Sequence, residues 1–243
     1  MLKPHQDAFG QLLHAHMKGG RPCLVVERDD GNVEAGPCMP VFFAKFNKWL
    51  RHEQRAMKYV SGRVLDVGVG AGRCALYLQK RGHRVVGIDN SPLAVKTAKA
   101  RGVRDARVMP LDRVGPRLGK FGTVLMLGNN FGLFESPRKA QCLLKRLHVV
   151  TTPNARIIAE SCDVYKVKEP RHVAYHKLNQ ARGRMAGALR LRVRYRTFCT
   201  PWFDYLNVSQ TEMEQILIGT GWRVRHYLYA RGPHYIAIIE KAP

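Results

Sequence analysis

The chain has 243 residues and carries 41 Lys and Arg against 18 Asp and Glu, a formal net charge of +23. This length allows one sizeable core, or a core domain with a small appendage, and excludes a large multidomain assembly. No run approaches the ~18 apolar residues of a membrane helix, and the first residues lack the layout of a signal peptide, so we expect a cytoplasmic protein without a membrane partner. The six cysteines are scattered and lack paired Cys/His spacing, which predicts no metal site.

Residues 1–60 mix turn signals with aromatic side chains. Phe42, Phe43, Phe46 and Trp49 form a cluster ahead of a charged helical pattern that runs through Lys58. We expect an N-terminal extension, which either shields a site as a lid or only packs on a domain covering residues 61–243.

From residue 61, short apolar runs alternate with helical patterns. We predict strands at 63–67, 84–88, 103–109, 123–127 and 155–160, and helices at 73–81, 92–101 and 137–148. Residues 161–206 interrupt this rhythm as an insertion, and a helix at 209–220 and two strands at 222–229 and 235–240 follow. The pattern predicts an α/β fold with a doubly wound, mostly parallel sheet and an antiparallel C-terminal hairpin.

A glycine-rich segment connects the first strand of this domain to its first helix. It reads Asp66-Val67-Gly68-Val69-Gly70-Ala71-Gly72, at the place where an open α/β sheet binds a nucleotide. The dinucleotide pattern GxGxxG needs a glycine at position 73, which is Arg73, so NAD is disfavoured.

Together with Asp89 at the end of the second strand, this segment resembles the cofactor loop of the class I S-adenosylmethionine-dependent methyltransferases. The resemblance implies a Rossmann-like methyltransferase fold, with S-adenosylmethionine as cofactor and S-adenosylhomocysteine as product. It also implies that Asp66 helps to hold the methionine amino end and that Asp89 takes both ribose hydroxyls. The implied cofactor-binding residues are Asp66, Gly68, Gly70, Gly72, Asp89, Asn90, Leu111, Asp112, Leu127 and Gly128.

The third strand leads to Leu111 and Asp112, for which two roles stay open. In the family an acidic residue here often lies near the adenine, and Asp112 comes one residue late. Either Asp112 still takes that role, or the Leu111 backbone contacts the adenine and Asp112 is a surface carboxylate.

Asn129 and Asn130 follow the fourth strand, at the edge of the sheet where substrates bind. Amino-methylating relatives often carry Asn or Asp followed by two prolines here; this chain lacks the prolines and is more similar to the turn of small-molecule methyltransferases such as the glycine N-methyltransferases. We expect these asparagines to contact the substrate; the alternative is a structural Asx turn.

Within the insertion, Arg190, Arg192, Arg194 and Arg196 alternate with other residues, so on a strand they share one face. Such a face could bind an acidic substrate or a phosphate backbone, or could simply be solvated. We take Arg194, Tyr195 and Trp202 as candidate substrate contacts. Trp202 and Asp204 either wall a pocket for a cationic or amine substrate or serve the core and a turn.

The sequence therefore predicts methyl transfer from S-adenosylmethionine to a nitrogen or oxygen atom of a small molecule by in-line displacement. Two alternatives are an RNA methyltransferase, less favoured because the charge is dispersed, and a cofactor-binding module without catalysis. The candidate catalytic residues are Asn129, Asn130 and Asp204; His52, His172, His176 and His234 are possible bases. Neither the base nor the oligomeric state follows from the sequence.

Overall fold

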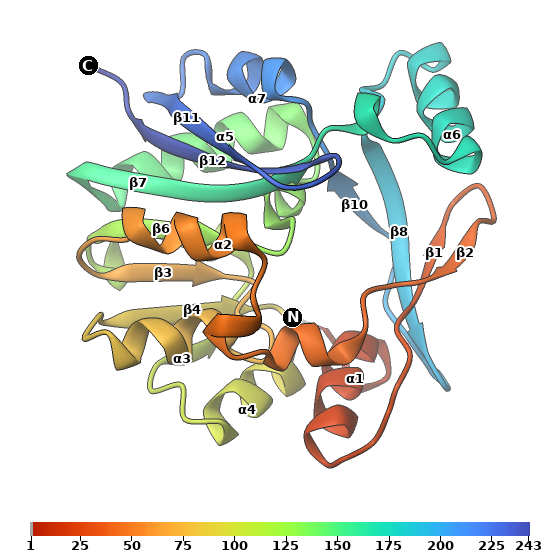
Figure 1. Ribbon diagram of the computed structural model, residues 1–243, viewed down its shortest axis with the longest axis horizontal. Coiled ribbons are helices and arrows are strands. Elements are labelled where there is room, and N and C mark those ends of the chain that lie inside the picture. Colours follow the sequence, from red (N-terminus) through yellow and green to blue (C-terminus); the bar gives the residue numbers. More distant parts are fainter. Residues whose placement is uncertain (1) are drawn as a thin grey trace. The chain divides into compact units, whose positions relative to one another are not determined.

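The computed structural model describes residues 2–243 (Figure 1). They divide into two compact units. Unit 1 comprises the segment up to Trp49 together with 62–114 and 191–203; unit 2 comprises 50–61, 115–190 and 204–243. The predicted extension over residues 1–60 is therefore shared between the units, and its role as a lid stays a prediction.

The parallel strands of unit 1 follow the order β3 (Val64–Val67), β4 (Val85–Asp89), β5 (Ala106–Val108). They are connected by α3 (Arg73–Lys80) and α4 (Pro92–Ala100). Ser91 caps α4 by accepting a hydrogen bond from the amide of Ala94, as its place before Pro92 predicts. The remaining helical turns of unit 1 are η1 (Pro4–Gln6), η2 (Met39–Phe43), η3 (Phe46–Lys48) and η5 (Leu111–Arg113).

Unit 2 holds four strands in the order β11 (Trp222–Tyr229), β12 (His234–Lys241), β7 (Thr151–Cys162), β6 (Phe121–Met126). β6 and β7 are parallel, while β12 is antiparallel to both β7 and β11. Every residue of β6 is buried, as expected for a central strand covered on both faces. The helices of unit 2 are α2 (Arg51–Ala56), η4 (Met57–Tyr59), η6 (Pro116–Leu118), η7 (Asn130–Phe134), α5 (Pro137–Val149), η8 (Val164–Lys166), α6 (Pro170–Ala181) and α7 (Gln210–Leu217).

These seven strands make up a mostly parallel sheet that ends in an antiparallel C-terminal hairpin, so the predicted α/β class is confirmed. The capping box of α7, from Ser209 to Glu212, is also confirmed. This helix is shorter than the predicted 209–220: it ends at Leu217, and the backbone of Ile218 is no longer helical. None of the helices in the described chain is long and apolar enough to cross a membrane.

The insertion pairs with the N-terminal hairpin in a second sheet (Figure 1). β1 (Val25–Arg28) is antiparallel to both β2 (Val33–Ala35) and β8 (Ala188–Tyr195), with Val26 opposite Val193. β9 (Phe198–Cys199) pairs with the end of β8, and β10 (Phe203–Leu206) follows.

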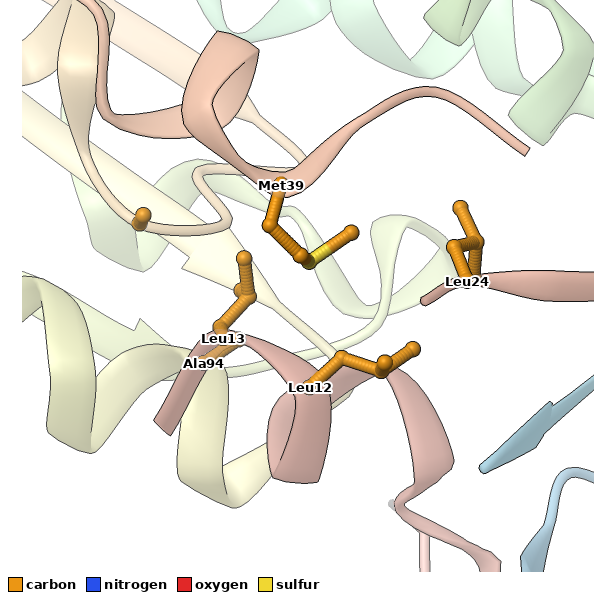
Figure 2. Packing of buried hydrophobic residues seen from close by; sticks show 6 residues of the cluster. Leu12, Leu13, Leu24, Met39 and Ala94 are labelled. Carbon is orange, nitrogen blue, oxygen red and sulfur yellow. The ribbon is translucent and has the colours of Figure 1, made fainter. Parts of the chain in front are cut away.

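The N-terminal helix α1 (Ala8–Met17) shares a hydrophobic core with the glycine-rich segment (Figure 2). Leu12 and Leu13 are fully buried and pack in one cluster with Met39, with Ala94 of α4 and with Ala71. Each buried Leu or Met contributes about 1.5–3 kcal/mol to folding. The N-terminal segment is thus an integral part of unit 1.

Asp7 joins α1 to α4 through one buried carboxylate. Its Oδ1 accepts from the amide of Gly10 at 3.0 Å and from the hydroxyl of Ser91 at 2.6 Å, and its Oδ2 accepts from the amide of Leu93 at 3.0 Å. The carboxylate therefore caps the N-termini of both helices, where the helix dipoles favour negative charge. This contact holds α1 beside the start of α4. That helix begins at Pro92, shortly after Asp89 in the sequence.

Candidate functional site

The glycine-rich loop of unit 1 runs from β3 to α3 in left-handed backbone conformations. Gly68, Gly70 and Gly72 have φ of 72°, 50° and 81°. A side chain at Gly72 would be strained by this φ, and its Cβ would come within 2.5 Å of a methyl group of Val103. The loop therefore requires glycine, which also leaves room for a ligand near the backbone.

Asp66 lies at the start of this loop as a buried carboxyl group, 4% exposed. Burial raises its pKa to about 7, although the charge of Arg73 and the amide of Ala75 act in the opposite direction. Its Oδ2 has no hydrogen-bond partner within residues 2–243. A buried acceptor without a donor is energetically costly. A ligand that brings a hydrogen-bond donor, above all a positively charged one, would remove this cost.

Asp89 ends β4 and is tied to the loop. One carboxylate oxygen accepts from the amide of Gly70 and the other from the amide of Ser91, both at 3.0 Å. Burial raises the pKa of Asp89 to about 6 against the effect of these amides. Each oxygen keeps a lone pair for a further donor. Asn90, the next residue, is exposed, and its carbonyl accepts from the amide of Leu2.

Leu111 and Asp112 belong to η5, which follows β5 in unit 1. Leu111 is half-buried, whereas Asp112 is exposed. The amide of Met109 donates to the carbonyl of Asp89 at 2.8 Å, which brings the end of β5 beside the end of β4. Both alternatives for the adenine contact stay predictions.

In unit 2, the segment Leu127-Gly128-Asn129-Asn130 forms a tight turn after β6. Gly128 and Asn129 are both left-handed, with φ of 72° and 66°. The Nδ2 of Asn129 donates to Oδ1 of Asn207 at 2.9 Å, and the side chain of Asn129 makes no capping hydrogen bond at the start of η7. Its Oδ1 is buried and has no hydrogen-bond partner within the described chain. The turn thus contains one buried acceptor without a donor among the described residues.

Residues distant in sequence support this turn. The hydroxyl of Tyr205 donates to the carbonyl of Asn129, and its ring fills the space in which a Cβ on Gly132 would lie. Burial raises the pKa of Tyr205 above its ordinary range, so the hydroxyl stays protonated. Glu160 accepts from the amides of Gly128 and Asn129.

Sequence reasoning did not place Glu160, Tyr205 or Asn207 at this turn. Glu160 lies near the carboxyl end of a predicted strand, a position that could have identified it. Tyr205 and Asn207 carry no local signal, because they reach the turn only through the fold. His52, one of the possible bases, is buried and directs its Nε2 toward Glu160.

The arginines of β8 are paired with acids. Arg192 makes a bidentate contact with Glu27 at 2.7 and 2.9 Å, and Arg194 donates to the same carboxylate at 2.9 Å. The hydrogen bond from Arg192 lowers the pKa of Glu27 below its ordinary value. Arg192 also stacks over the ring of Trp202, 4.6 Å from its centroid. The alternation does place these guanidinium groups on one face, but a local acid shares their charge.

The other residues predicted for the substrate make contacts of other kinds. Tyr195 packs against the core cluster of unit 1. Asp204 is exposed and accepts from Arg190 at 3.0 Å. Asn130 begins η7 directly after Asn129. No group of three or more potential ligands that could hold a metal ion occurs among residues 2–243.

Comparison with known proteins gives the matching family. Residues 64–154 match a model described as a methyltransferase domain. A SAM-dependent methyltransferase from Bacteroides fragilis, solved with S-adenosyl-L-homocysteine, has a TM-score of 0.85 at 24% identity, covering 100% of this chain and 98% of that one. A SAM-dependent methyltransferase from Methanosarcina mazei has a TM-score of 0.59 at 16% identity, covering 76% and 95%.

A 2-heptyl-1-hydroxyquinolin-4(1H)-one methyltransferase from Mycobacteroides abscessus is 39% identical over 72 residues. The alignment spans 27% of this chain and 32% of that protein, so about a third of the relative is matched. The region matched by the family model contains the glycine-rich loop and Asp89. Residues 64–154 thus match a methyltransferase domain, and the two solved SAM-dependent methyltransferases share the fold of this chain.

Proposed function

We propose that this protein transfers a methyl group from S-adenosylmethionine to a nitrogen or oxygen atom of a small molecule by in-line displacement. The observation that carries the proposal is the buried Oδ1 of Asn129, an acceptor with no hydrogen-bond partner within residues 2–243. Asn129 lies in the turn after β6, near the end of a parallel strand where open α/β sheets bind their substrates.

The residues of unit 1 fit the cofactor. The unpartnered oxygen of Asp66 suits the positively charged amino group of the methionine part, and Asp89 has lone pairs left for the ribose hydroxyls. The open backbone of Gly70, whose Cβ would meet nothing closer than 3.9 Å, leaves space beside them. When bound, S-adenosylmethionine supplies a methyl group attached to a positively charged sulfur.

Asn129 selects the kind of atom that is methylated. Its Nδ2 already donates to Asn207, and the polar atom of the side chain that has no partner within residues 2–243 is the carboxamide oxygen. An oxygen of this kind accepts a hydrogen bond from an N–H or O–H group and offers nothing to a bare acceptor. The contact would orient the lone pair of that nitrogen or oxygen, and orientation is the main contribution a protein can make to such a displacement.

Two observations support a small molecule over RNA as the acceptor. Arg192 and Arg194 share their charge with Glu27, and Arg190 pairs with Asp204, so the alternating arginines are not a free phosphate-binding row. The relative from Mycobacteroides abscessus is named for a small hydroxyquinolone. We therefore propose a small acceptor that carries an O–H or N–H group.

The test is a methyl-transfer assay with a labelled methyl group and three kinds of acceptor. These are 2-heptyl-1-hydroxyquinolin-4(1H)-one, a panel of small amines and phenols, and total RNA. Label in a small molecule supports the proposal, and label in RNA alone would replace it with the RNA alternative. Cofactor binding without transfer to any acceptor would favour a binding module.

Asn129→Ala provides the matched variant. Loss of a hydrogen bond made in the transition state should lower kcat about tenfold. Asn154→Ala is the control, because Asn154 is exposed at the opposite, N-terminal end of β7. Equal activity of the two variants would contradict the role of Asn129.

A further inference from the structure

A buried histidine–carboxylate pair lies beside the 128–130 turn. His52 of α2 is 3% exposed and Glu160 of β7 is 5% exposed. The Nε2 of His52 lies 3.1 Å from Oε1 of Glu160. Burying ionisable groups is costly unless all their hydrogen-bonding capacity is used, so the second oxygen of Glu160 also needs partners.

The turn supplies these partners. Oε2 of Glu160 accepts from the amide of Gly128 at 2.6 Å and from the amide of Asn129 at 3.3 Å. Two successive amides that converge on one oxygen form an anion-binding nest. Asn129 adopts a left-handed conformation, which asparagine tolerates better than most residues with a side chain, and the charge-assisted hydrogen bonds stabilise it further.

We infer that Glu160 and His52 are positioning residues, which fix the 128–130 turn and thereby aim the carboxamide of Asn129 at the methyl acceptor. Glu160 acts on the turn directly, and His52 acts through Glu160 by holding its other oxygen. The inference rests on the proposed function, since it takes Asn129 as the contact to the acceptor.

The other contacts of Asn129 explain why the backbone controls the side chain. Its carbonyl accepts from Tyr205, and its Nδ2 donates to Asn207. With the amide on Glu160, three separate groups of Asn129 are held, one by β7 and two by the segment 205–207. Release of the amide would therefore rotate the peptide and change the direction of the free oxygen.

The charge state of Glu160 agrees with this role. Burial raises the pKa of the carboxyl group, but the hydrogen bond and charge of His52 and the amides of Gly128 and Asn129 together bring it below its ordinary value. Tyr205 faces the same carboxylate and stays protonated. The nest therefore holds an anion throughout the neutral pH range.

The first arm of the experiment needs no ligand. In the NMR spectrum of the intact protein, a short hydrogen bond to a carboxylate places the amide proton of Gly128 downfield. Glu160→Gln keeps the shape and removes the charge, so this signal should move upfield and the side-chain NH₂ signals of Asn129 should shift with it. Glu240→Gln is the control: it removes ion pairs to Arg223 and Arg225 on the neighbouring strand, away from the turn.

The second arm measures methyl transfer to the acceptor found in the assay above. Glu160→Gln should lower kcat by roughly 10- to 100-fold, as a small misalignment does, and leave the KM for S-adenosylmethionine unchanged. His52→Ala should have a similar effect, whereas His52→Gln, which can still donate to Glu160, should recover much of the rate. Recovery of the rate in His52→Gln would show that the loss in His52→Ala comes from the missing hydrogen bond to Glu160. A loss of folding would not be reversed in this way.

Each outcome is decisive. Shifted signals with lowered kcat and rescue by His52→Gln support the inference. Unshifted Gly128 and Asn129 signals in Glu160→Gln overturn it, and so do shifted signals with an unchanged kcat, although the enzyme would still be a methyltransferase. If the wild-type protein methylates nothing, the proposed function fails and the positioning role falls with it, even where the signals shift.

Discussion

The raised pKa of Asp66 predicts how the stability of the protein, and its binding of the cofactor, change with pH. A carboxyl group whose pKa rises from 3.8 to about 7 on folding costs about 4 kcal/mol to ionise in the folded protein. Between these two values the folded state binds more protons than the unfolded state. The free energy of unfolding should therefore fall as the pH rises through this window and level off above it.

Asp66→Asn removes this dependence, because the amide is neutral at every pH and has nearly the same shape. The linkage relation predicts that the cofactor-free wild-type protein loses about 2.5 kcal/mol between pH 5 and pH 8 through this group alone. Asp89, with a pKa raised to about 6, adds a dependence of the same sign to both proteins. The difference between the two proteins isolates Asp66.

The assay is urea unfolding of both cofactor-free proteins at pH 5, 6, 7 and 8. Asp105→Asn is the control: the hydrogen bond from Arg107 lowers the pKa of Asp105, so that group is ionised over the whole range and adds no slope. We expect the free energy of unfolding of Asp66→Asn, relative to that of the wild type, to increase as the pH rises from 5 to 8. Parallel curves for the two proteins would refute the reasoning.

The same carboxylate should be required for ligand binding. If Asp66 takes the cationic amino group of the cofactor, binding favours its ionised form, and the affinity for S-adenosylmethionine should rise as the pH increases through 7. The asparagine variant should bind weakly, with little dependence on pH, when both proteins are compared by titration calorimetry. A more stable protein that binds the cofactor normally would show that the unpartnered oxygen serves no ligand.

Three further predictions concern the rest of the candidate site. Asp89→Ala should weaken S-adenosylmethionine binding by about 1.5–3 kcal/mol in calorimetry, because the ribose loses its acceptors; unchanged binding would contradict the cofactor assignment. Gly132→Ala should lower the free energy of unfolding by about 1–3 kcal/mol through overlap with a tyrosine ring, whereas Gly115→Ala, with nothing within 4 Å of its new Cβ, should have little effect; equal melting temperatures would exclude the clash. Changing Arg192 and Arg194 to Ser should leave the salt dependence of RNA affinity nearly unchanged, because both guanidinium groups are paired with an acid; a clearly reduced slope would revive the RNA alternative.

Local patterns were sufficient to predict most elements of the fold. The strand–loop–helix order around Gly68, Gly70 and Gly72 follows from residues close in sequence, and so do the caps at Ser91 and Ser209. Apolar runs, helix caps and glycine turns act within a few residues, so the sequence displays them directly. The placement of Asp66 and Asp89 at the ends of successive parallel strands was predictable for the same reason.

Charge was a poorer guide, because the sequence does not display pairing. The alternation in β8 correctly placed Arg192 and Arg194 on one face, yet their acid, Glu27, is 165 and 167 residues away. From sequence alone, a row of like charges suggests a binding surface, because the acidic residues that pair with it are not visible. Only the pairing of β1 with β8 brings that carboxylate to the arginines.

The sequence by itself therefore determined the α/β class, the glycine-rich loop and the two acids beside it, since each depends on local geometry. The surroundings of Asn129 were decided by tertiary structure alone. Glu160 is 108 residues from His52, and Asn207 is 78 residues from Asn129. Hydrogen bonds between such distant groups depend on how β6, β7, α2 and the segment after β10 pack, and no short-range pattern encodes that packing.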